Sequence, residues 1–596
     1  MIRTPLRPLA RILEARSNGE NPDTIERENL RLRHEAMRDR AMARAKFRLG
    51  VLAASFAVAF IAIGGRMGLM ASQTPVEPAS ETGSLTIQAG RADIVDRQGL
   101  ILATNMLTHS LYVQTADLVD PLRVARELAA LFPDLNEDDL RRRFTDGRSF
   151  LWVRKVLSPE QLQAVHDIGD PGLLFGPRVM RLYPNGALAA HILGGTSFGN
   201  EGVNSAEVIG VAGIEKALDA RLRDPATADQ PLQLSIDLTL QATMEEVLTA
   251  GMQMMHAKGA AGILMNVQSG EILAMVSLPN FDPNDRPSPI VAKGGEAADS
   301  PLFNRAVQGV YELGSTFKIF AAAQAMELGL VTPDTQVDTA SLRIGKKSIT
   351  EFEGHNYGPT KSVAEVIEVS SNIGTGNIAL MIGGERQQQF LSLMGLLDAS
   401  PVELVEAPGA KPLRPDRWPD IVTVTASFGH GISSSPLNLA AAYASIGNGG
   451  IKVTPTLLKR TTPMKGIRVL RKEVALDAVK MLRRVVVSGT ATLADVPGYQ
   501  VAGKTGTADK PKPGGGYYAD KVINTFASVF PADNPQYVLV VTMDEPEGSS
   551  GAEIRRTAGW TAVPVAAEII KRVAPLMGMR PVVEQTPDIE LTAVKN

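Results

Sequence analysis

The sequence predicts an α/β protein in which one membrane-spanning helix precedes two external domains. Residues 49–65 (LGVLAASFAVAFIAIGG) are uncharged and apolar enough for a membrane helix. Residues 231–580 carry strand-like hairpin patterns near both ends, with helical patterns between them. Residues 72–230 mix shorter strand and helix patterns. We therefore expect an antiparallel sheet flanked by helices in the larger domain, and an α+β domain before it.

The composition is that of an ordinary globular protein with several domains. The chain has 596 residues, of which 44% are hydrophobic and 21% are charged. The net charge of −3 offers no basic excess for nucleic acid. The chain has no cysteine, which excludes disulfides and thiolate chemistry and suits an oxidising compartment. The seven histidines are scattered without metal-ligand spacing, so we expect no metal site.

The N-terminal region predicts a cytoplasmic leader and an uncleaved anchor. Residues 1–48 contain twelve Lys/Arg and seven Asp/Glu, and the stretch 24–46 is expected to be a polar helix. The anchor is expected over 49–71, with Arg66 reaching the interface. No Lys or Arg occurs between residues 67 and 90, so the positive-inside rule places the leader in the cytoplasm and the remainder outside. A cleaved signal peptide is the alternative, but its leader would be unusually long.

The smaller domain, 72–230, reads as a support or docking module. A linker is expected over 73–83, followed by a hairpin that turns at Gln98-Gly99. Residues 116–170 predict two or three helices, capped at Asp120-Pro121 and Ser158-Pro159. No nucleophile and base stand together here. In the hairpin we expect an exposed, structural ion-pair network of Arg91, Asp93, Asp96 and Arg97.

The larger domain, 231–580, is predicted to contain the sheet, and the tail 581–596 is predicted to be disordered. A loop rich in Pro, Asp and Gly is expected over about 280–310. The expected elements are a strand over Leu232–Asp237, a helix over Leu238–Ala257, a hairpin of Ala260–Asn266 and Glu271–Ser277, a second hairpin of Thr525–Phe530 and Tyr537–Met543, and a last helix over Thr561–Val573.

The candidate nucleophile is Ser315, at the expected start of a buried, alanine-rich helix. Gly314 permits a tight turn before it, and Lys318 lies one helical turn further along the same face. Burial favours a neutral lysine, which can accept a hydroxyl proton. Ser-x-x-Lys by itself is more often a surface helix turn. Here it occurs once in the chain, inside an apolar helix.

A second candidate motif, Ser370-Ser371-Asn372, follows an apolar helix expected over Val363–Val369. The plain alternative is a helix C-terminus with its loop. In a functional interpretation, Ser370 relays a proton from Lys318, and the Asn372 amide donates to a substrate carbonyl.

A third motif, Lys504-Thr505-Gly506-Thr507, lies on a strand expected to begin at Val501. Its glycine permits close approach of another backbone. Lys504 and the two threonine hydroxyls suit a substrate carboxylate, although this motif alone is weak evidence. The glycine-rich residues 511–518 predict a mobile loop beside the site.

Together and in this order, the three motifs match the signature of serine β-lactamases and penicillin-binding proteins. Ser371 replaces the aspartate of the class A lactamases, which is similar to the looser Ser-x-Asn of penicillin-binding proteins. From Arg91 to about Val573, the chain resembles the class B penicillin-binding proteins. Leu313 stands where that family more usually has proline. The resemblance implies a penicillin-binding/serine transpeptidase-like domain behind a non-catalytic pedestal, which is similar to a dimerisation domain.

The resemblance implies a peptidoglycan D,D-transpeptidase. Its donor is a stem peptide ending in D-Ala-D-Ala, its acceptor is an amine of a neighbouring stem peptide, and β-lactams inhibit it by acylation. No metal or organic cofactor is expected. The implied roles are nucleophile for Ser315, base for Lys318, proton relay for Ser370 with Lys504, carbonyl contact for Asn372, oxyanion contact for the backbone amides of Ser315 and Thr507, and carboxylate binding for Thr505, Gly506 and Thr507.

Within class B, His355–Gly358 and the single anchor look most like the cell-division members, the penicillin-binding protein 3 type. The elongation-specific transpeptidase is the near alternative. A D,D-carboxypeptidase or lactamase would need a water-activating group, and the sequence offers no separate glutamate with an obvious role. A β-lactam sensor would have several membrane spans or a signalling domain, and the sequence shows neither pattern. An inactive scaffold is less consistent with three intact motifs. The implied partners are a membrane glycan polymerase and divisome proteins, with the catalytic domain in the periplasm at the division site.

Overall fold

The computed structural model separates the chain into two units, residues 1–83 and 84–596. The expected linker 73–83 lies outside the described residues. So do residues 583–596 of the expected disordered tail, 581–596. The structure describes residues 7–72, 90–201, 206–288, 295–462, 464–512, 515–550 and 553–582.

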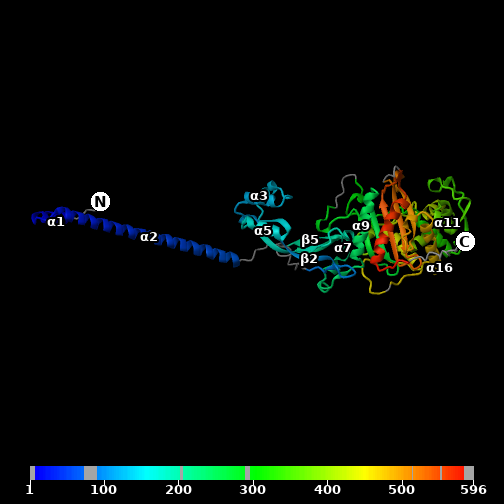
Figure 1. Ribbon diagram of the computed structural model, residues 1–596, viewed down its shortest axis with the longest axis horizontal. Helices are drawn as coiled ribbons and strands as arrows, with labels where there is room; N and C mark the ends of the chain where they lie inside the picture. The colour runs from blue at the N-terminus through cyan, green and yellow to red at the C-terminus, as the bar shows by residue number, and fades with distance from the viewer. Residues whose placement is uncertain are drawn as a thin grey trace, which may run out of the picture. The chain divides into compact units, whose positions relative to one another are not determined.

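The first unit consists of helices α1 (Arg7–Ser17) and α2 (Pro22–Ser72), drawn in dark blue in Figure 1. Helix α2 is 51 residues long and joins the expected charged helix to the expected membrane segment without a break. Within the described residues, it is the one helix that is long and apolar enough to cross a membrane. The segment 49–65 inside it lacks charged side chains, which fits the hydrocarbon core of a bilayer.

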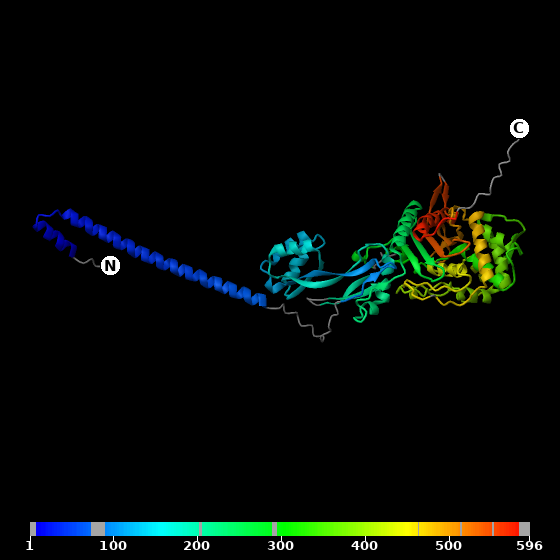
Figure 2. The ribbon, with the colours of Figure 1, turned by 60° about the horizontal axis from the view of Figure 1, so that its bottom comes forward.

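The second unit begins with the pedestal, whose long central strand is β2 (Ile101–Gln114). This strand pairs antiparallel with both β3 (Phe150–Leu157) and β4 (Leu173–Leu182), as Figure 2 shows. The sequence analysis missed β3. The apolar core on this sheet is covered by α3 (Pro121–Leu131), α4 (Glu137–Thr145) and α5 (Pro159–Ile168).

The helix starts predicted in the pedestal are confirmed. The Asp120 side chain accepts a hydrogen bond from the Arg123 N–H at the start of α3, and Ser158 forms a capping box with Gln161 at the start of α5. The remaining elements of the pedestal are α6 (Ala190–Leu193), β5 (Gly195–Glu201), β6 (Ala206–Ala212), α7 (Gly213–Ala217) and α8 (Asp219–Leu222).

A short strand, β1 (Ile94–Val95), connects the pedestal to the larger domain. It pairs antiparallel with β2 and parallel with β7 (Leu232–Gln233). The hairpin predicted around Gln98-Gly99 is therefore confirmed. The predicted strand Leu232–Asp237 is only two residues long in the structure. Leu234 forms an isolated bridge with Leu458 instead, and Asp237 caps the next helix with its side chain.

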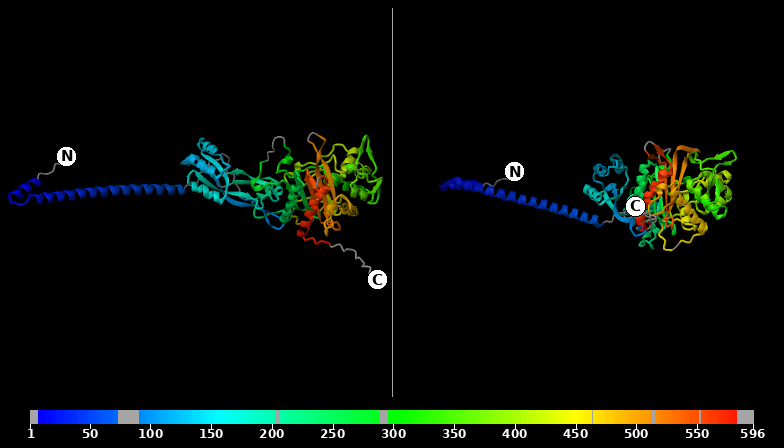
Figure 3. Two further views of the ribbon diagram at one scale, coloured as in Figure 1. Left: turned by 45° about the horizontal axis from the view of Figure 1, so that its top comes forward. Right: turned by 45° about the vertical axis from the view of Figure 1, so that its right-hand side comes forward.

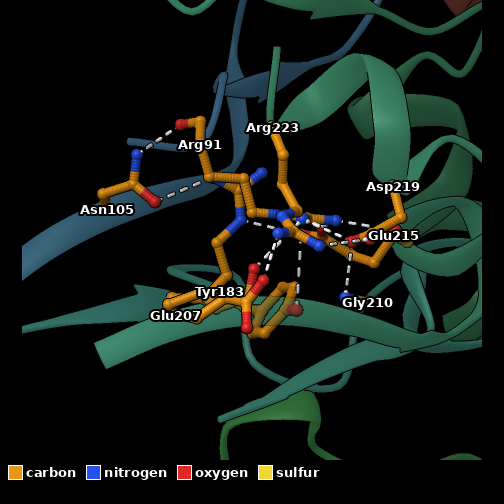
Figure 4. Close-up of polar contacts among 10 residues, drawn as sticks. Arg91, Asn105, Tyr183, Glu207, Gly210, Glu215, Asp219 and Arg223 are labelled. Atoms are coloured by element: carbon orange, nitrogen blue, oxygen red, sulfur yellow. Dashed lines mark hydrogen bonds and ion pairs between the residues drawn. The ribbon is translucent and has the colours of Figure 1, made fainter. Parts of the chain in front are cut away.

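A buried ion cluster stabilises this junction (Figure 4). Arg91 donates from Nε to Glu215 Oε2 at 2.6 Å and from Nη1 to Asp219 Oδ1 at 2.7 Å. Arg181 donates from Nε to the other oxygen of Glu215 at 2.7 Å. The Asn105 amide donates to the Arg91 carbonyl. One carboxylate thus serves two buried guanidinium groups that lie 90 residues apart in the sequence.

The predicted exposed network of Arg91, Asp93, Asp96 and Arg97 is wrong. Arg91 and Asp96 are buried, and neither pairs with the other members. Arg91 turns toward α7 and α8, while the Asp96 carboxylate accepts backbone N–H groups of Gln98, Leu100 and Leu238. Arg97 approaches Glu271 instead, at 3.8 Å. The hairpin is covered by segments more than 100 residues away, which local spacing does not reveal.

We expect Glu215→Gln to lower the free energy of unfolding by about 3–5 kcal/mol, because it leaves two buried guanidinium groups without their shared charge. Asp139→Asn, which breaks only exposed pairs with Arg142 and Arg143, should change it by less than about 1 kcal/mol. Chemical unfolding of the detergent-solubilised chain, followed by tryptophan fluorescence, measures both. Equal stability of the two variants would contradict the role of the cluster.

The larger domain is built on a five-stranded antiparallel sheet in the order β14-β15-β16-β8-β9. Both predicted hairpins are present, and β15 extends further toward the N-terminus than expected. The strands are β8 (Gly259–Asn266), β9 (Ile272–Leu278), β14 (Ala502–Pro511), β15 (Tyr517–Phe530) and β16 (Tyr537–Asp544).

Helices cover both faces of this sheet, as predicted. Helices α9 (Leu238–Met254) and α17 (Ala562–Leu576) pack against each other on one face, where α17 is red in Figure 3. Helices α15 (Pro436–Gly447) and α16 (Lys472–Val487) pack on the other face, and α16 contacts the edge strand β14.

A helical subdomain lies beside α16, near the label α11 in Figure 1. Its central helix, α10, is buried over nearly its whole length, as its alanine-rich sequence predicts. The helical subdomain contains η4 (Gly314–Phe317), α10 (Lys318–Glu327), α11 (Val363–Val369), α12 (Asn372–Ile382), α13 (Gly384–Leu393), α14 (Asp420–Ser427), β10 (Gln336–Asp338), β11 (Leu342–Ile344), β12 (Lys347–Ile349) and β13 (Thr360–Ser362). Outside it, β17 (Gly548–Ser550) and β18 (Glu553–Arg555) form a separate two-stranded sheet.

Candidate active site

The turn that contains Ser315 packs backbone to backbone against strand β14. Gly314 has φ +57°, and a Cβ added to it would lie 2.8 Å from the Thr507 carbonyl oxygen. A Cβ added to Gly506 would lie 2.2 Å from the Leu313 carbonyl oxygen. Side chains at either glycine would force the two segments apart. These glycines therefore bring the first and third motifs together, as predicted from the sequence.

Lys318 connects the first motif to the second. Its side chain is buried, and Nζ lies 2.8 Å from Asn372 Oδ1 and 3.1 Å from Ser370 Oγ and also contacts the Ser370 carbonyl. Burial lowers the pKa of Lys318 well below its usual value, and the nearby Lys504 lowers that pKa further, while Glu351 acts in the opposite direction. These contributions favour a neutral amine, which is the form that a general base requires.

Lys504 approaches the same hydroxyl from β14. Its side chain is fully buried, and Nζ donates to Ser370 Oγ at 2.9 Å. Burial lowers the pKa of Lys504 to about 7. Ser370 lies between α11 and α12 with φ 65°, in the left-handed region. Its hydroxyl lies between the amino groups of Lys318 and Lys504. The three motifs thus converge on one hydroxyl.

A cavity of about 600 Å³ opens above this cluster. Ser315 is half-buried and lines it, so its hydroxyl can be reached by a ligand. Of the other expected site residues, those that line the cavity are Ser370, Asn372, Thr505 and Thr507.

The threonines of the third motif are held by hydrogen bonds at one wall of the cavity. Thr505 Oγ1 lies 2.6 Å from Thr490 Oγ1, and Thr507 Oγ1 accepts from the Ala558 N–H at 3.0 Å. Gly506 is not among the cavity-lining residues, and its contact with the Leu313 carbonyl gives it a packing role. A substrate contact of Gly506, through its backbone, stays a prediction.

In the described part of the chain, Lys318 and Ser315 share no hydrogen bond. Nζ of Lys318 is instead directed at Ser370 and Asn372. Catalytic hydrogen bonds of free enzymes are often long and tighten when substrate binds, so this arrangement is compatible with a base. The Asn372 amide nitrogen donates to the Thr350 carbonyl at 3.0 Å, which leaves its second N–H for a ligand.

Sequence reasoning missed Glu351. This carboxylate is buried and accepts hydrogen bonds from Ser371 Oγ at 2.5 Å and from the Asn372 N–H at 2.6 Å. It follows β12 and lies about twenty residues before the motif it contacts, in a segment without regular periodicity. No local pattern marks it, because only the fold brings the two segments together.

The loop predicted over 511–518 is too long at both ends, because its first residue and its last two residues belong to strands. Pro511 is the last residue of β14, and Tyr517 is the first residue of β15. Residues 513–514, between them, lie outside the described part of the chain. The Tyr517 hydroxyl donates to both oxygens of Glu312, at 3.0 and 3.2 Å, which ties this hairpin to the turn before Ser315.

Comparisons with known proteins agree with this geometry. The model of the penicillin-binding protein transpeptidase domain matches residues 260–571, and that of the penicillin-binding protein dimerisation domain matches residues 86–227. The solved structure of penicillin binding protein 3 from Mycobacterium tuberculosis, complexed with ampicillin, is similar with a TM-score of 0.64 and 25% identity. That likeness covers 84% of this chain and 98% of the other.

Two curated relatives cover most of the chain. A Caulobacter vibrioides protein described as "Probable peptidoglycan D,D-transpeptidase FtsI" is 34% identical over 92% of this chain and 92% of its own length. The Escherichia coli (strain K12) protein "Peptidoglycan D,D-transpeptidase FtsI" is 28% identical over 83% of this chain and 85% of its own length. The chain therefore belongs to the penicillin-binding proteins of the peptidoglycan D,D-transpeptidase family, which combine a dimerisation domain with a transpeptidase domain.

Proposed function

We propose that this chain cross-links peptidoglycan stem peptides through an acyl-enzyme on Ser315 during septal wall synthesis. The observation that carries the proposal is the convergence of three motifs on the Ser370 hydroxyl, beneath a cavity that Ser315 lines. A low-dielectric cluster with two lysines of lowered pKa is suited to moving protons at neutral pH.

In the first half-reaction, Ser315 Oγ attacks the carbonyl carbon of the penultimate D-Ala, and its proton passes to neutral Lys318. The oxygen that becomes negative accepts hydrogen bonds from the backbone N–H groups of Ser315 and Thr507. The peptide C–N bond then breaks, and the departing D-Ala amine takes a proton through Ser370. The free carboxylate of the donor lies against Thr505 and Thr507, next to Lys504.

In the second half-reaction, an amine of a neighbouring stem peptide attacks the ester carbonyl. Its proton passes to Lys318, the ester C–O bond breaks, and Ser315 Oγ recovers a proton. A β-lactam enters at the first step, and its ring nitrogen remains tethered to the acyl group after the ring amide opens. This accounts for inhibition by acylation in terms of the same residues.

The proposed setting follows from the anchor and the relatives. We infer that α2 inserts once in the cytoplasmic membrane, with residues 1–48 in the cytoplasm and the pedestal and catalytic domain in the periplasm at the division site. A membrane glycan polymerase and divisome proteins are the proposed partners. We further propose domain boundaries of 1–48, 49–71, 72–230, 231–580 and 581–596.

The test of this proposal is fluorescent penicillin labelling of the detergent-solubilised chain, followed by peptide mapping. We expect one labelled peptide, carrying the label on Ser315. Incubation with a D-Ala-D-Ala stem peptide and an amine acceptor should then give more cross-linked than hydrolysed product. Excess hydrolysis would favour a carboxypeptidase, and a fluorescent fusion found along the lateral wall would favour the elongation-specific alternative.

The proposed base predicts how the acylation rate depends on pH. Because the pKa of Lys318 is lowered, the amine is neutral above that pKa, and the rate should fall as acidification protonates it. Lys504→Met removes a charge that lowers the pKa of Lys318. The acid limb, which is the part of the pH–rate profile where acidification lowers the acylation rate, should therefore move to higher pH. Lys480→Met, which removes an exposed lysine on α16, should leave the limb in place. A rate that stays constant far into the acid range would contradict this base.

A further inference from the structure

Glu351 contacts the start of α12 with both of its carboxylate oxygens. Oε1 accepts from Ser371 Oγ at 2.5 Å and from the Ile373 N–H at 3.2 Å, and Oε2 accepts from the Asn372 N–H at 2.6 Å. The side chain is buried, with the residue 6% exposed. Hydrogen bonds to an ionised carboxylate are about twice as strong as neutral ones, so these three contacts fix the turn firmly.

The turn that Glu351 holds also receives the amino group of Lys318. Lys318 Nζ contacts Asn372 Oδ1 and both the carbonyl and the hydroxyl of Ser370, and these residues flank Ser371. A shift of the turn would therefore move both the proposed base and the proposed relay. Glu351 itself does not line the cavity, so it acts on the reaction through its neighbours.

Glu351 also contributes a negative charge to a cluster that otherwise contains two lysines. The titratable groups on which its charge acts are Lys318 from α10 and the phenol of Tyr357 from the loop after η5 (Phe352–Gly354), and Lys504 from β14 acts on the same Lys318. Its charge raises the pKa of Lys318, whereas burial and Lys504 lower that pKa. The carboxylate therefore limits how far the amine is shifted toward the neutral form.

On this basis we infer that Glu351 is a positioning residue for the transpeptidase reaction, which fixes the Ser-Ser-Asn turn against which the Lys318 amine is held. The inference rests on the function proposed above. It assigns to a residue outside the three motifs both a geometric and an electrostatic effect on the base.

The test compares Glu351→Gln with Glu403→Gln by measuring the rate of penicillin acylation across pH. Glu403 is a matched control, because its carboxylate also accepts from a threonine hydroxyl (Thr456, 2.6 Å) and a backbone N–H (Leu457, 2.8 Å) and does not line the cavity. We expect Glu351→Gln to slow acylation by up to about 10²-fold through misplacement of the turn. We also expect its acid limb to move to lower pH, because the charge that raises the pKa of Lys318 is lost. Glu403→Gln should change neither quantity.

An unchanged rate, or a slower rate with an unmoved acid limb, would overturn the inference, since a purely structural carboxylate would leave the limb in place. If Glu351→Gln does not fold, Glu351→Asp carries the test, because it keeps the charge but shortens the reach. It should acylate more slowly with the limb unmoved, and a wild-type rate would overturn the geometric effect. Failure of the wild-type chain to label at Ser315 would instead refute the proposed function.

Discussion

Ser315→Ala is expected to abolish covalent labelling by penicillin. The substitution removes the atom that forms the acyl bond, and in a serine protease the loss of the nucleophilic serine lowers turnover on the order of 10⁶-fold. The Ser315 side chain makes no hydrogen bond within the described residues, so its removal should leave folding unchanged. Gel fluorescence after incubation with a fluorescent penicillin measures the label, and circular dichroism measures the fold.

Two outcomes would refute Ser315 as the nucleophile. The first is a labelled Ser315→Ala protein. The second is a wild-type protein labelled at Ser370. This serine lines the same cavity as Ser315, so it is the alternative nucleophile that peptide mapping must exclude. Ser370→Ala should retain a slow acylation that maps to Ser315, because it interrupts proton relay but leaves the nucleophile in place.

Lys318→Met is expected to slow acylation by about 10²–10⁴-fold, the usual contribution of a general base. Methionine keeps most of the buried volume and removes the amine, so the helix α10 should remain packed. Lys318→Arg provides a second variant, because a guanidinium stays charged and cannot accept the proton. Rapid-mixing measurement of the acylation rate at a fixed penicillin concentration distinguishes these variants from wild type.

The arginine variant separates two roles of Lys318. If the lysine acts as a base, both variants should be slow. If its role is only to supply positive charge, Lys318→Arg should restore much of the rate, and the assignment as base would be wrong. Lys480→Met again serves as the exposed-lysine control, since its pairing with Asp477 on the surface of α16 contributes little to stability.

Much of the catalytic domain was predictable because its signals are local. The hairpin over 260–277 shows as two apolar runs around a turn that contains glycine, and the helix after Ser315 shows as an alanine-rich run of good helix formers. The prediction that the three motifs meet is also supported, since Lys318 and Lys504 both donate to Ser370. That prediction came from the order of the motifs and the resemblance, which periodicity alone would not provide.

The residues that the sequence did not reveal all depend on contacts between distant segments. Glu351 joins the site from a short irregular stretch, and Tyr517 reaches Glu312 across about 200 residues. Arg91 was expected to pair within its own hairpin, but its carboxylate partners are Glu215 and Asp219. Side chains of this kind show only a charge or a hydroxyl in the sequence, and nothing in their neighbours indicates the partner.

The buried cluster at Arg91 also has a consequence for the order in which the pedestal can form during synthesis. The carboxylate that Arg91 needs is made 124 residues later. At a translation rate of roughly 5–20 residues per second, that interval lasts roughly 6–25 s. Strand β1 likewise cannot form its parallel pairing with β7 until Leu232 has been synthesised. A ribosome-bound chain truncated before Glu215 should therefore leave the first hairpin accessible to protease, and the junction should close only once the start of the catalytic domain has emerged.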